Sequence, residues 1–204
     1  NVTAKALAVS ATSNSANKVY DSSRTATATL TSTDLITNDL LTINYSAASF
    51  NDKNVGTNKT VSVSGINISG TDSSNYSLQN NTTTTTSSIT TKALTISGVS
   101  AANKVYDSTT AATLSGGVLT NGATGASDNL FYSTDTLTLN TTTAGVFNNK
   151  NVGTGKAVTT SGFSLSGTDA GNYSLTQPSY LAANVTAKAL TISGVSAANK
   201  VYDS

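Results

Sequence analysis

The side chains in this sequence that could do chemistry are lysines, aspartates and tyrosines, and several recur in a fixed order. The hexapeptide Asn-Lys-Val-Tyr-Asp-Ser occurs at residues 17–22, 103–108 and 199–204. It places an aspartate directly after a tyrosine at Tyr20 and Asp21, and again at Tyr106 and Asp107. A tyrosine packed on a sheet with its hydroxyl bonded nearby is commoner than a reactive one, so these pairs are interpreted as structural.

Enzymatic chemistry is not expected from this composition. The sequence has no Glu, His or Cys, whereas general acid and base catalysis usually draws on these residues, with Asp and Lys, in a pocket. The absence of Cys also excludes disulfides and thiolate metal sites. The 10 acidic residues are all Asp and are spread along the chain, so a calcium site is not expected either. No catalytic, cofactor-binding or metal-binding residue is predicted.

Two lysines lie in equivalent blocks and are candidates for a covalent crosslink. Lys53 and Lys150 each begin the sequence Lys-Asn-Val-Gly-Thr, so each lies directly beside an asparagine. A lysine beside asparagine could form an intramolecular isopeptide bond if a buried aspartate assisted. The alternative is a lysine whose stem covers apolar surface while its charge stays in water.

Aligning the recurring blocks divides the chain into a first repeat at 1–91, a second at 92–187 and the start of a third at 188–204. Residues 1–7 recur at 184–190, so both ends are expected to lie inside the repeating pattern. The second copy carries an insertion around residues 121–133, which is expected to be a surface loop. Its aromatic residues Phe131 and Tyr132 are candidates for a loop that binds carbohydrate or a partner protein.

The spacing of apolar residues predicts short strands rather than helices. Val61 and Val63 alternate with polar residues, as do Leu94 and Ile96, and Gly-rich turns separate such segments. Residues 34–41 are not expected to form a long helix. The predicted fold is all-β, with tandem immunoglobulin-like β-sandwich repeats. A β-grasp-like repeat is the alternative.

Two further patterns support this fold. Tyr173 ends a segment, 169–173, that is similar to the tyrosine corner of immunoglobulin-like domains, and Tyr76 is its equivalent in the first copy. Its hydroxyl is expected to bond to nearby backbone. Residues 88–96 are β-branched and polar without Pro or Gly, which predicts stiff, strand-like junctions between repeats.

Charge and hydropathy argue against two classes of partner. The formal net charge is +1, from 11 basic and 10 acidic residues, so nucleic-acid binding is not expected. No apolar run approaches the roughly 18 residues of a spanning helix, so membrane insertion is not expected.

The recurring blocks together resemble the YDG repeat domains, relatives of the MBG repeats, over the whole chain. They are Asn-Lys-Val-Tyr-Asp-Ser, Lys-Asn-Val-Gly-Thr, Gly-Thr-Asp-Ala-Gly-Asn-Tyr-Ser-Leu and Lys-Ala-Leu-Thr-Ile. Such repeats are found in large adhesins of the filamentous-haemagglutinin type, exported by two-partner secretion. The family takes its name from the motif Tyr-Asp-Gly. In this sequence the third residue of the motif is serine instead of the usual glycine, at Ser22, Ser108 and Ser204. The resemblance implies an extracellular location, at a bacterial cell surface or in a biofilm matrix.

Three functions follow as hypotheses. The leading one is a structural stalk or spacer in an extracellular adhesin or surface filament, whose partners are the neighbouring repeats of the same chain. The second is an adhesive module that binds host or matrix carbohydrate or protein. The third is self-association into fibres, with a strand around residues 185–192 pairing with a neighbouring chain.

Overall fold

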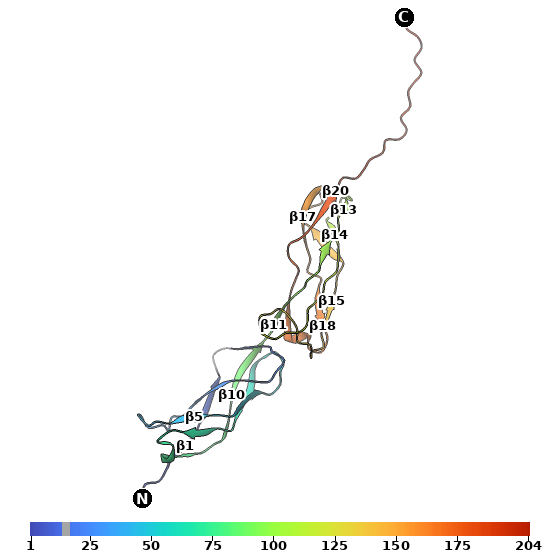
Figure 1. The fold of residues 1–204 in the computed structure, drawn as a ribbon. Helices are drawn as coiled ribbons and strands as arrows, with labels where there is room; N and C mark the ends of the chain where they lie inside the picture. Colours follow the sequence, from blue (N-terminus) through green and yellow to red (C-terminus); the bar gives the residue numbers. More distant parts are fainter. Residues whose placement is uncertain (14–16) are drawn as a thin grey trace. The chain divides into compact units, whose positions relative to one another are not determined.

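The computed structural model describes residues 1–13 and 17–204, and its secondary structure is almost entirely β (Figure 1). Among these residues the helical elements are two short 3₁₀ turns, η1 (Ser73–Asn75) and η2 (Ala170–Asn172). Residues 34–41 form no helix, as expected. The prediction of an all-β tandem-repeat fold is confirmed. The described residues offer no α-helix of the kind that the alternative β-grasp fold packs against its sheet.

The chain forms two compact units whose limits differ from those of the sequence repeats. The first unit comprises Asn1–Ser97, Val118–Asn140 and Ser164–Thr176, and the second comprises Gly98–Gly117, Thr141–Phe163 and Gln177–Ser204. One end of the second repeat therefore belongs to the same compact unit as the whole first repeat.

The first unit is built from short strands in small sheets. One four-stranded sheet has the order β3-β10-β7-β6, and the remaining strands pair as β1-β9, β2-β4, β5-β8, β11-β19 and β15-β18. Their bounds are β1 (Lys5–Leu7), β2 (Ser10–Ser13), β3 (Lys18–Val19), β4 (Ala28–Thr31), β5 (Thr42–Asn44), β6 (Ala47–Phe50), β7 (Gly56–Ser64), β8 (Asn67–Ser69), β9 (Tyr76–Leu78), β10 (Thr82–Thr90), β11 (Lys92–Thr95), β15 (Thr138–Asn140), β18 (Ser164–Ser166) and β19 (Tyr173–Thr176).

The second unit contains one six-stranded sheet with the order β12-β14-β16-β17-β20-β13. Phe147, Leu114 and Val185 are its most deeply buried apolar side chains. The strand bounds are β12 (Ser100–Ala101), β13 (Lys104–Val105), β14 (Ala111–Ser115), β16 (Ala144–Phe147), β17 (Gly153–Thr159) and β20 (Leu181–Thr186).

The core of the first unit follows the alternation seen in the sequence. Val61 and Val63 point inward from β7 and are almost fully buried, while their neighbours in the strand face solvent. The same cluster includes Leu94 and Tyr173, which come from the second repeat. Apolar packing is therefore shared across the boundary between the two repeats.

The connection between the repeats is a single residue long. Strand β10 ends at Thr90 and β11 begins at Lys92, so only Thr91 lies between them. The end of β10 pairs with β3 of the first repeat, and β11 pairs in parallel with β19 of the second. The predicted strand-like junction is confirmed.

Residues 188–204 have the same sequence as residues 92–108 but a different structure. The earlier copy forms β11, β12 and β13, which pair with β19, β14 and β20 from later in the same repeat. The later copy has no secondary structure, and Leu190 is 87% exposed where its equivalent Leu94 is 0% exposed. These strands therefore depend on partners that are distant in sequence. Val185 and Thr186, expected to be available to a neighbouring chain, belong to β20 and already pair with β13.

The structure explains why glycine is usual at the third position of the Tyr-Asp-Gly motif. Ser22 and Ser108 have φ values of 62° and 63°, which lie in the left-handed region. That region crowds the Cβ of an ordinary residue, whereas glycine enters it without a steric cost. The two serines thus hold the motif's turn under strain.

We predict that Ser108→Gly stabilises the protein by about 0.5–1 kcal/mol, because relief of the left-handed strain exceeds the entropy cost of glycine. The same change at Ser22 should gain less, since the Ser22 hydroxyl donates a hydrogen bond to Asp135 Oδ1 at 3.1 Å. Thermal unfolding of both variants measures the difference. An equal gain at the two positions would show that the Ser22 hydrogen bond contributes nothing.

Candidate functional site

Each repeat holds a tyrosine whose hydroxyl is tied to an aspartate far upstream. Tyr173 follows η2, donates to Asp135 Oδ2 at 2.7 Å and accepts from the backbone N–H of Tyr132 at 3.1 Å. In the first repeat Tyr76 donates to Asp39 Oδ2 at 2.6 Å and accepts from a backbone N–H at 2.9 Å. The expected hydrogen bond to backbone is present in both repeats, from the N–H groups of Tyr132 and Ile36. The second bond, to an aspartate carboxylate, was not expected.

A second aspartate stands beside each tyrosine in the Gly-Thr-Asp turn. Asp169 Oδ2 accepts from the backbone N–H of Thr136 at 3.0 Å, directly after Asp135 in the chain. Gly167 allows this approach, because a Cβ there would lie 2.4 Å from the Thr136 carbonyl oxygen. Asp72 and Gly70 make the equivalent contacts in the first repeat. The turn thereby places two carboxylates side by side.

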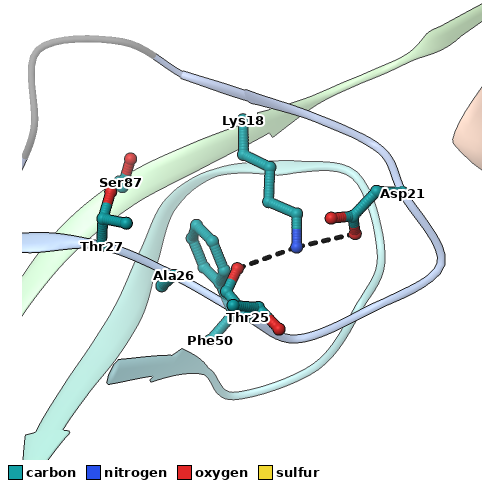
Figure 2. Close-up of a pocket in the computed structure, with 7 residues that line it drawn as sticks. All are labelled: Lys18, Asp21, Thr25, Ala26, Thr27, Phe50 and Ser87. Carbon is teal, nitrogen blue, oxygen red and sulfur yellow. Dashed lines mark hydrogen bonds and ion pairs between the residues drawn. The ribbon is translucent and has the colours of Figure 1, made fainter. Parts of the chain in front are cut away.

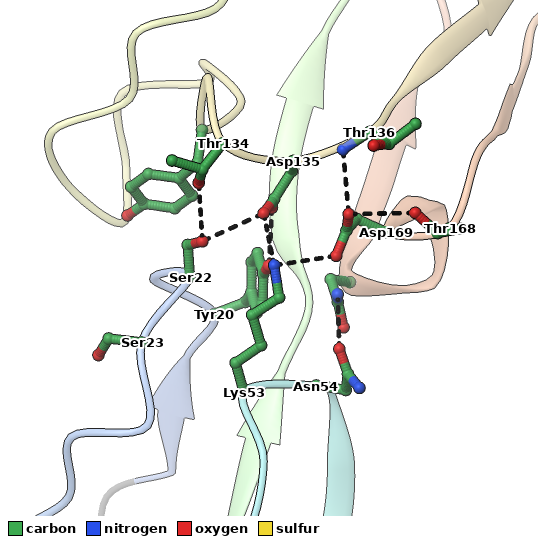
Figure 3. Close-up of polar contacts among 12 residues, drawn as sticks. Tyr20, Ser22, Ser23, Lys53, Asn54, Thr134, Asp135, Thr136, Thr168 and Asp169 are labelled. Carbon is green, nitrogen blue, oxygen red and sulfur yellow. Dashed lines mark hydrogen bonds and ion pairs between the residues drawn. The ribbon is translucent and has the colours of Figure 1, made fainter.

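In the second repeat this pair of carboxylates binds two side chains of the first repeat (Figure 3). Tyr20 donates to Asp135 Oδ2 at 2.6 Å. Lys53 Nζ lies 2.7 Å from Asp135 Oδ1 and 3.0 Å from Asp169 Oδ1. The ammonium group therefore bridges two loops of the second repeat, and we call these residues, with Tyr173, the junction cluster.

Aromatic and amide contacts surround the junction cluster. The rings of Tyr20 and Tyr173 meet edge to face, with centroids 5.3 Å apart. Asn172 is 4% exposed; its Oδ1 accepts from the backbone N–H of Val55 at 2.9 Å and its Nδ2 donates to Asn54 Oδ1 at 3.2 Å. Asn172 thus adds two hydrogen bonds that cross the boundary between the repeats.

Burial and charge together set the protonation of the junction cluster. Burial alone would raise the pKa of Asp135, but the Lys53 ammonium and the hydroxyls of Tyr20 and Tyr173 lower it below its ordinary value. Burial opposes the charge of Lys53, yet its hydrogen bonds to Asp135 and Asp169 raise the pKa of Lys53 above its ordinary value. Burial, and then the bond to Asp135, raise the pKa of both tyrosines. The cluster is stable as an ion pair with two neutral phenols.

The inserted loop of the second repeat covers a buried lysine. Lys92, on β11, is 0% exposed and forms an ion pair with Asp128 at 2.7 Å. Its ammonium also donates to the carbonyl oxygen of Gly125 and lies over the ring of Tyr132, 5.5 Å from the centroid. The pKa of Asp128 is lowered, chiefly by the bond from Lys92. The insertion therefore packs onto the start of its own repeat.

The lysine of the recurring hexapeptide closes its own loop. Figure 2 shows Lys18 beside a small cavity that Phe50 also lines, with dashed contacts to Asp21 and Thr25. Lys18 Nζ lies 2.7 Å from Asp21 Oδ1 and donates to the Thr25 carbonyl oxygen at 2.8 Å. Lys104 repeats this arrangement with Asp107 and two carbonyl oxygens, and the bond from Lys104 lowers the pKa of Asp107 to about 2. In both copies the lysine of the motif thus closes the loop that follows it, and we call these contacts of Lys18 and Lys104 the loop clasp.

The residues proposed for other roles are placed as follows. Phe131 and Tyr132 are partly buried and pack against the core of the first unit, and a binding role for them stays a prediction. Lys53 contacts carboxylates rather than an asparagine side chain. Lys150 is exposed, and the contacts described for the chain give it no hydrogen bond or ion pair. Isopeptide formation by either lysine also stays a prediction.

Tyr20, Asp21, Tyr106, Asp107, Tyr76 and Tyr173 all lie in the described structure, and the junction cluster contains two of them. Sequence reasoning missed Asp135, which is the centre of the cluster. The signal was present in the alignment, because Asp39 begins Asp-Leu-Leu-Thr-Ile-Asn and Asp135 begins Asp-Thr-Leu-Thr-Leu-Asn. An aspartate at equivalent positions of both copies could have been paired with the equivalent tyrosines.

Over residues 1–13 and 17–204 no group of three or more acidic residues is arranged to hold a metal ion. Within the same residues no helix is both long and apolar enough to span a bilayer. The family model for the YDG domain matches the chain twice, at residues 3–86 and 90–180. No curated protein and no solved structure shows significant similarity to the chain.

We predict that Asp135→Asn lowers the free energy of unfolding by about 1–3 kcal/mol, because buried donors lose a charged acceptor. Asp39→Asn is the matched control: it weakens the equivalent bond to Tyr76. Among the residues that the structure describes, no lysine forms an ion pair with Asp39. Thermal unfolding should show a clearly larger loss for Asp135→Asn. Equal losses would mean that Tyr20 and Lys53 add nothing at the junction.

The pH dependence of stability should have two limits. The lowered pKa of Asp135 means that its contribution is complete above the ordinary value of 3.8 and is lost as the pH falls below it. The raised pKa values of Tyr20 and Tyr173 mean that theirs is complete below 10.0 and is lost as the pH rises above it. Melting temperatures measured across this pH range test both limits. In a Tyr20→Phe, Tyr173→Phe double variant, the melting temperature should fall much less as the pH rises above 10.0.

Proposed function

Because the chain belongs to the YDG domain family, with two copies of the domain in tandem, we propose that it is a structural stalk or spacer segment of an extracellular bacterial adhesin or surface filament. One observation carries the proposal. Tyr20 and Lys53 of the first repeat are bound by Asp135 and Asp169 of the second, inside a single compact unit. A bonded interface of this kind suits a segment that holds another part of the protein at a fixed distance from the cell.

A spacer must resist bending where its modules meet. The connection here has only Thr91 between two paired strands, so few backbone dihedral angles are available to act as a hinge. The junction cluster adds directional bonds beside this connection, and Leu94 and Tyr173 share the core of the first repeat. Backbone continuity, polar contacts and apolar packing thus all oppose rotation about the junction.

The location is part of the same proposal. We propose a bacterial cell surface or biofilm matrix, reached by two-partner secretion, since the sequence resembles repeats of adhesins exported in that way. A chain without Cys does not depend on the redox state of its surroundings for its fold. The neighbouring repeats of the chain are its proposed partners.

A second candidate function is self-assembly into fibres. Strands β11, β12 and β13 each pair with a strand from later in their repeat, namely β19, β14 and β20. A neighbouring chain could supply the equivalent partner strands.

Small-angle scattering of arrays of two, three and four repeats distinguishes these functions. The spacer predicts a radius of gyration that grows in proportion to the number of repeats, with a mass independent of concentration. Asp135→Asn at every junction should weaken that growth toward the square-root dependence of a flexible chain. Asp107→Asn, in the loop clasp, is the control and should leave the growth unchanged.

A wild-type array that scales as a flexible chain would overturn the spacer proposal. A mass that increases with concentration would instead support fibre assembly.

A further inference from the structure

The first repeat carries the same pair of carboxylates that binds Lys53 and Tyr20 in the second. Asp39, Asp72 and Tyr76 correspond to Asp135, Asp169 and Tyr173, respectively. Tyr76 donates to Asp39 Oδ2 at 2.6 Å, and Asp72 Oδ2 accepts from the backbone N–H that follows Asp39 at 2.7 Å. The acceptor arrangement is therefore built before any partner is bound.

This acceptor surface is open where its counterpart is covered. Asn75 is exposed, whereas the equivalent Asn172 is 4% exposed. In the contacts described for the chain, Asp39 Oδ1 and Asp72 Oδ1 have no donor, although the equivalent oxygens of Asp135 and Asp169 bind Lys53. A cavity borders Asp39 and Asn75. The unfilled positions are those that a lysine occupies in the second repeat.

The second repeat carries the matching donors, and they too lie open. Tyr106 is half-exposed, whereas its equivalent Tyr20 is 0% exposed. Lys150, the equivalent of Lys53, is exposed, and Val152 is 55% exposed where the equivalent Val55 is half-buried. The surface around Tyr20 and Lys53 is covered by the second repeat, whereas the equivalent surface around Tyr106 and Lys150 is uncovered.

We propose that Asp39, Asp72, Tyr76 and Asn75 form a docking surface for the Lys150 and Tyr106 end of another copy of the repeat, joined ahead of it in one polypeptide. This deepens the proposed spacer function and rests on it. The internal comparison carries the inference, because the equivalent residues already bind a lysine and a tyrosine in this structure.

The contacts follow from the junction cluster. Lys150 Nζ binds Asp39 Oδ1 and Asp72 Oδ1, and the Tyr106 hydroxyl donates to Asp39 Oδ2. The backbone N–H of Val152 donates to Asn75 Oδ1, as that of Val55 does to Asn172 Oδ1. Asp39 Oδ2, which already accepts from Tyr76, takes a second hydrogen bond here, as Asp135 Oδ2 does from Tyr20 and Tyr173.

A covalently joined copy is the favoured occupant. Residues 1–7 repeat residues 184–190, in which strand β20 ends and the next Lys-Ala-Leu segment begins. The sequence ahead of Lys5 therefore has the pattern of a preceding repeat's last strand. A tether this short gives a high effective concentration of the donor end at the acceptor surface.

The test uses the 204-residue chain preceded by an extra copy of residues 92–183, which joins without a foreign residue because residues 184–190 and 1–7 are identical. Amide hydrogen exchange at Val152 is measured by NMR. The Val152 amide of the leading copy should exchange at least about 10-fold more slowly than that of the trailing copy, since its N–H is hydrogen-bonded and buried. The trailing copy should exchange at its rate in the 204-residue chain and serves as an internal control.

Lys150→Ala in the leading copy, or Asp39→Asn, should abolish the protection of the leading Val152 amide. Lys200→Ala is the matched control, because it removes a lysine that is 77% exposed and is paired only with Asp203. Asp72→Asn repeats the test if Asp39→Asn disturbs the first repeat, whose integrity is read from the amides of Val61 and Val63.

Equal exchange of the two Val152 amides would overturn the proposal. Protection that depends on protein concentration would also overturn it, because the donor would then come from another chain. If a four-repeat array scatters as a rod while its Val152 amides stay unprotected, the docking proposal is refuted and the spacer proposal is retained.

Discussion

The Asp135 carboxylate is the centre of the polar contacts between the two repeats in the first unit. Two tyrosine hydroxyls and one ammonium group bond to it, and its side chain is fully buried. A buried carboxylate without partners would be strongly destabilising, so the loop that carries Asp135 must stay where Tyr20 and Lys53 can reach it. The charge that is costly to bury thereby holds this loop of the second repeat against Tyr20 and Lys53 of the first. Apolar contacts alone tolerate sliding, whereas these bonds specify direction and distance.

The same carboxylate explains why equivalent residues differ between the two copies. Tyr20 and Tyr106 occupy the same place in the same hexapeptide, yet only Tyr20 is fully buried. The difference lies in what covers each tyrosine rather than in the repeat itself. Identical sequences at 92–108 and 188–204 make the point more strongly, because one is three strands and the other is none. In this fold a strand is specified by its partner as much as by its own residues.

This dependence sets what could be predicted from the sequence. The alternation at Val61 and Val63, the strand-like connection around Thr91 and the all-β class are local or periodic features, and they were predicted. The pairing of Tyr173 with Asp135 joins residues that no local pattern connects, since a turn and several strands separate them. The strain at Ser22 was likewise visible only as a departure from the usual glycine until its φ value was known.

A polar joint also suits a repeat that must survive with one end uncovered. An apolar surface of the size needed to hold two repeats would be an aggregation hazard wherever a partner is missing. Lysine, aspartate and tyrosine are tolerated in water when unpaired, as Lys150 and Tyr106 are here, and they become strongly bonded once a neighbour excludes solvent. The narrow composition of the chain, with few large apolar residues, is consistent with joints made in this way. Matched charges and hydrogen bonds then add direction to the apolar packing that Leu94 and Tyr173 share with the first repeat.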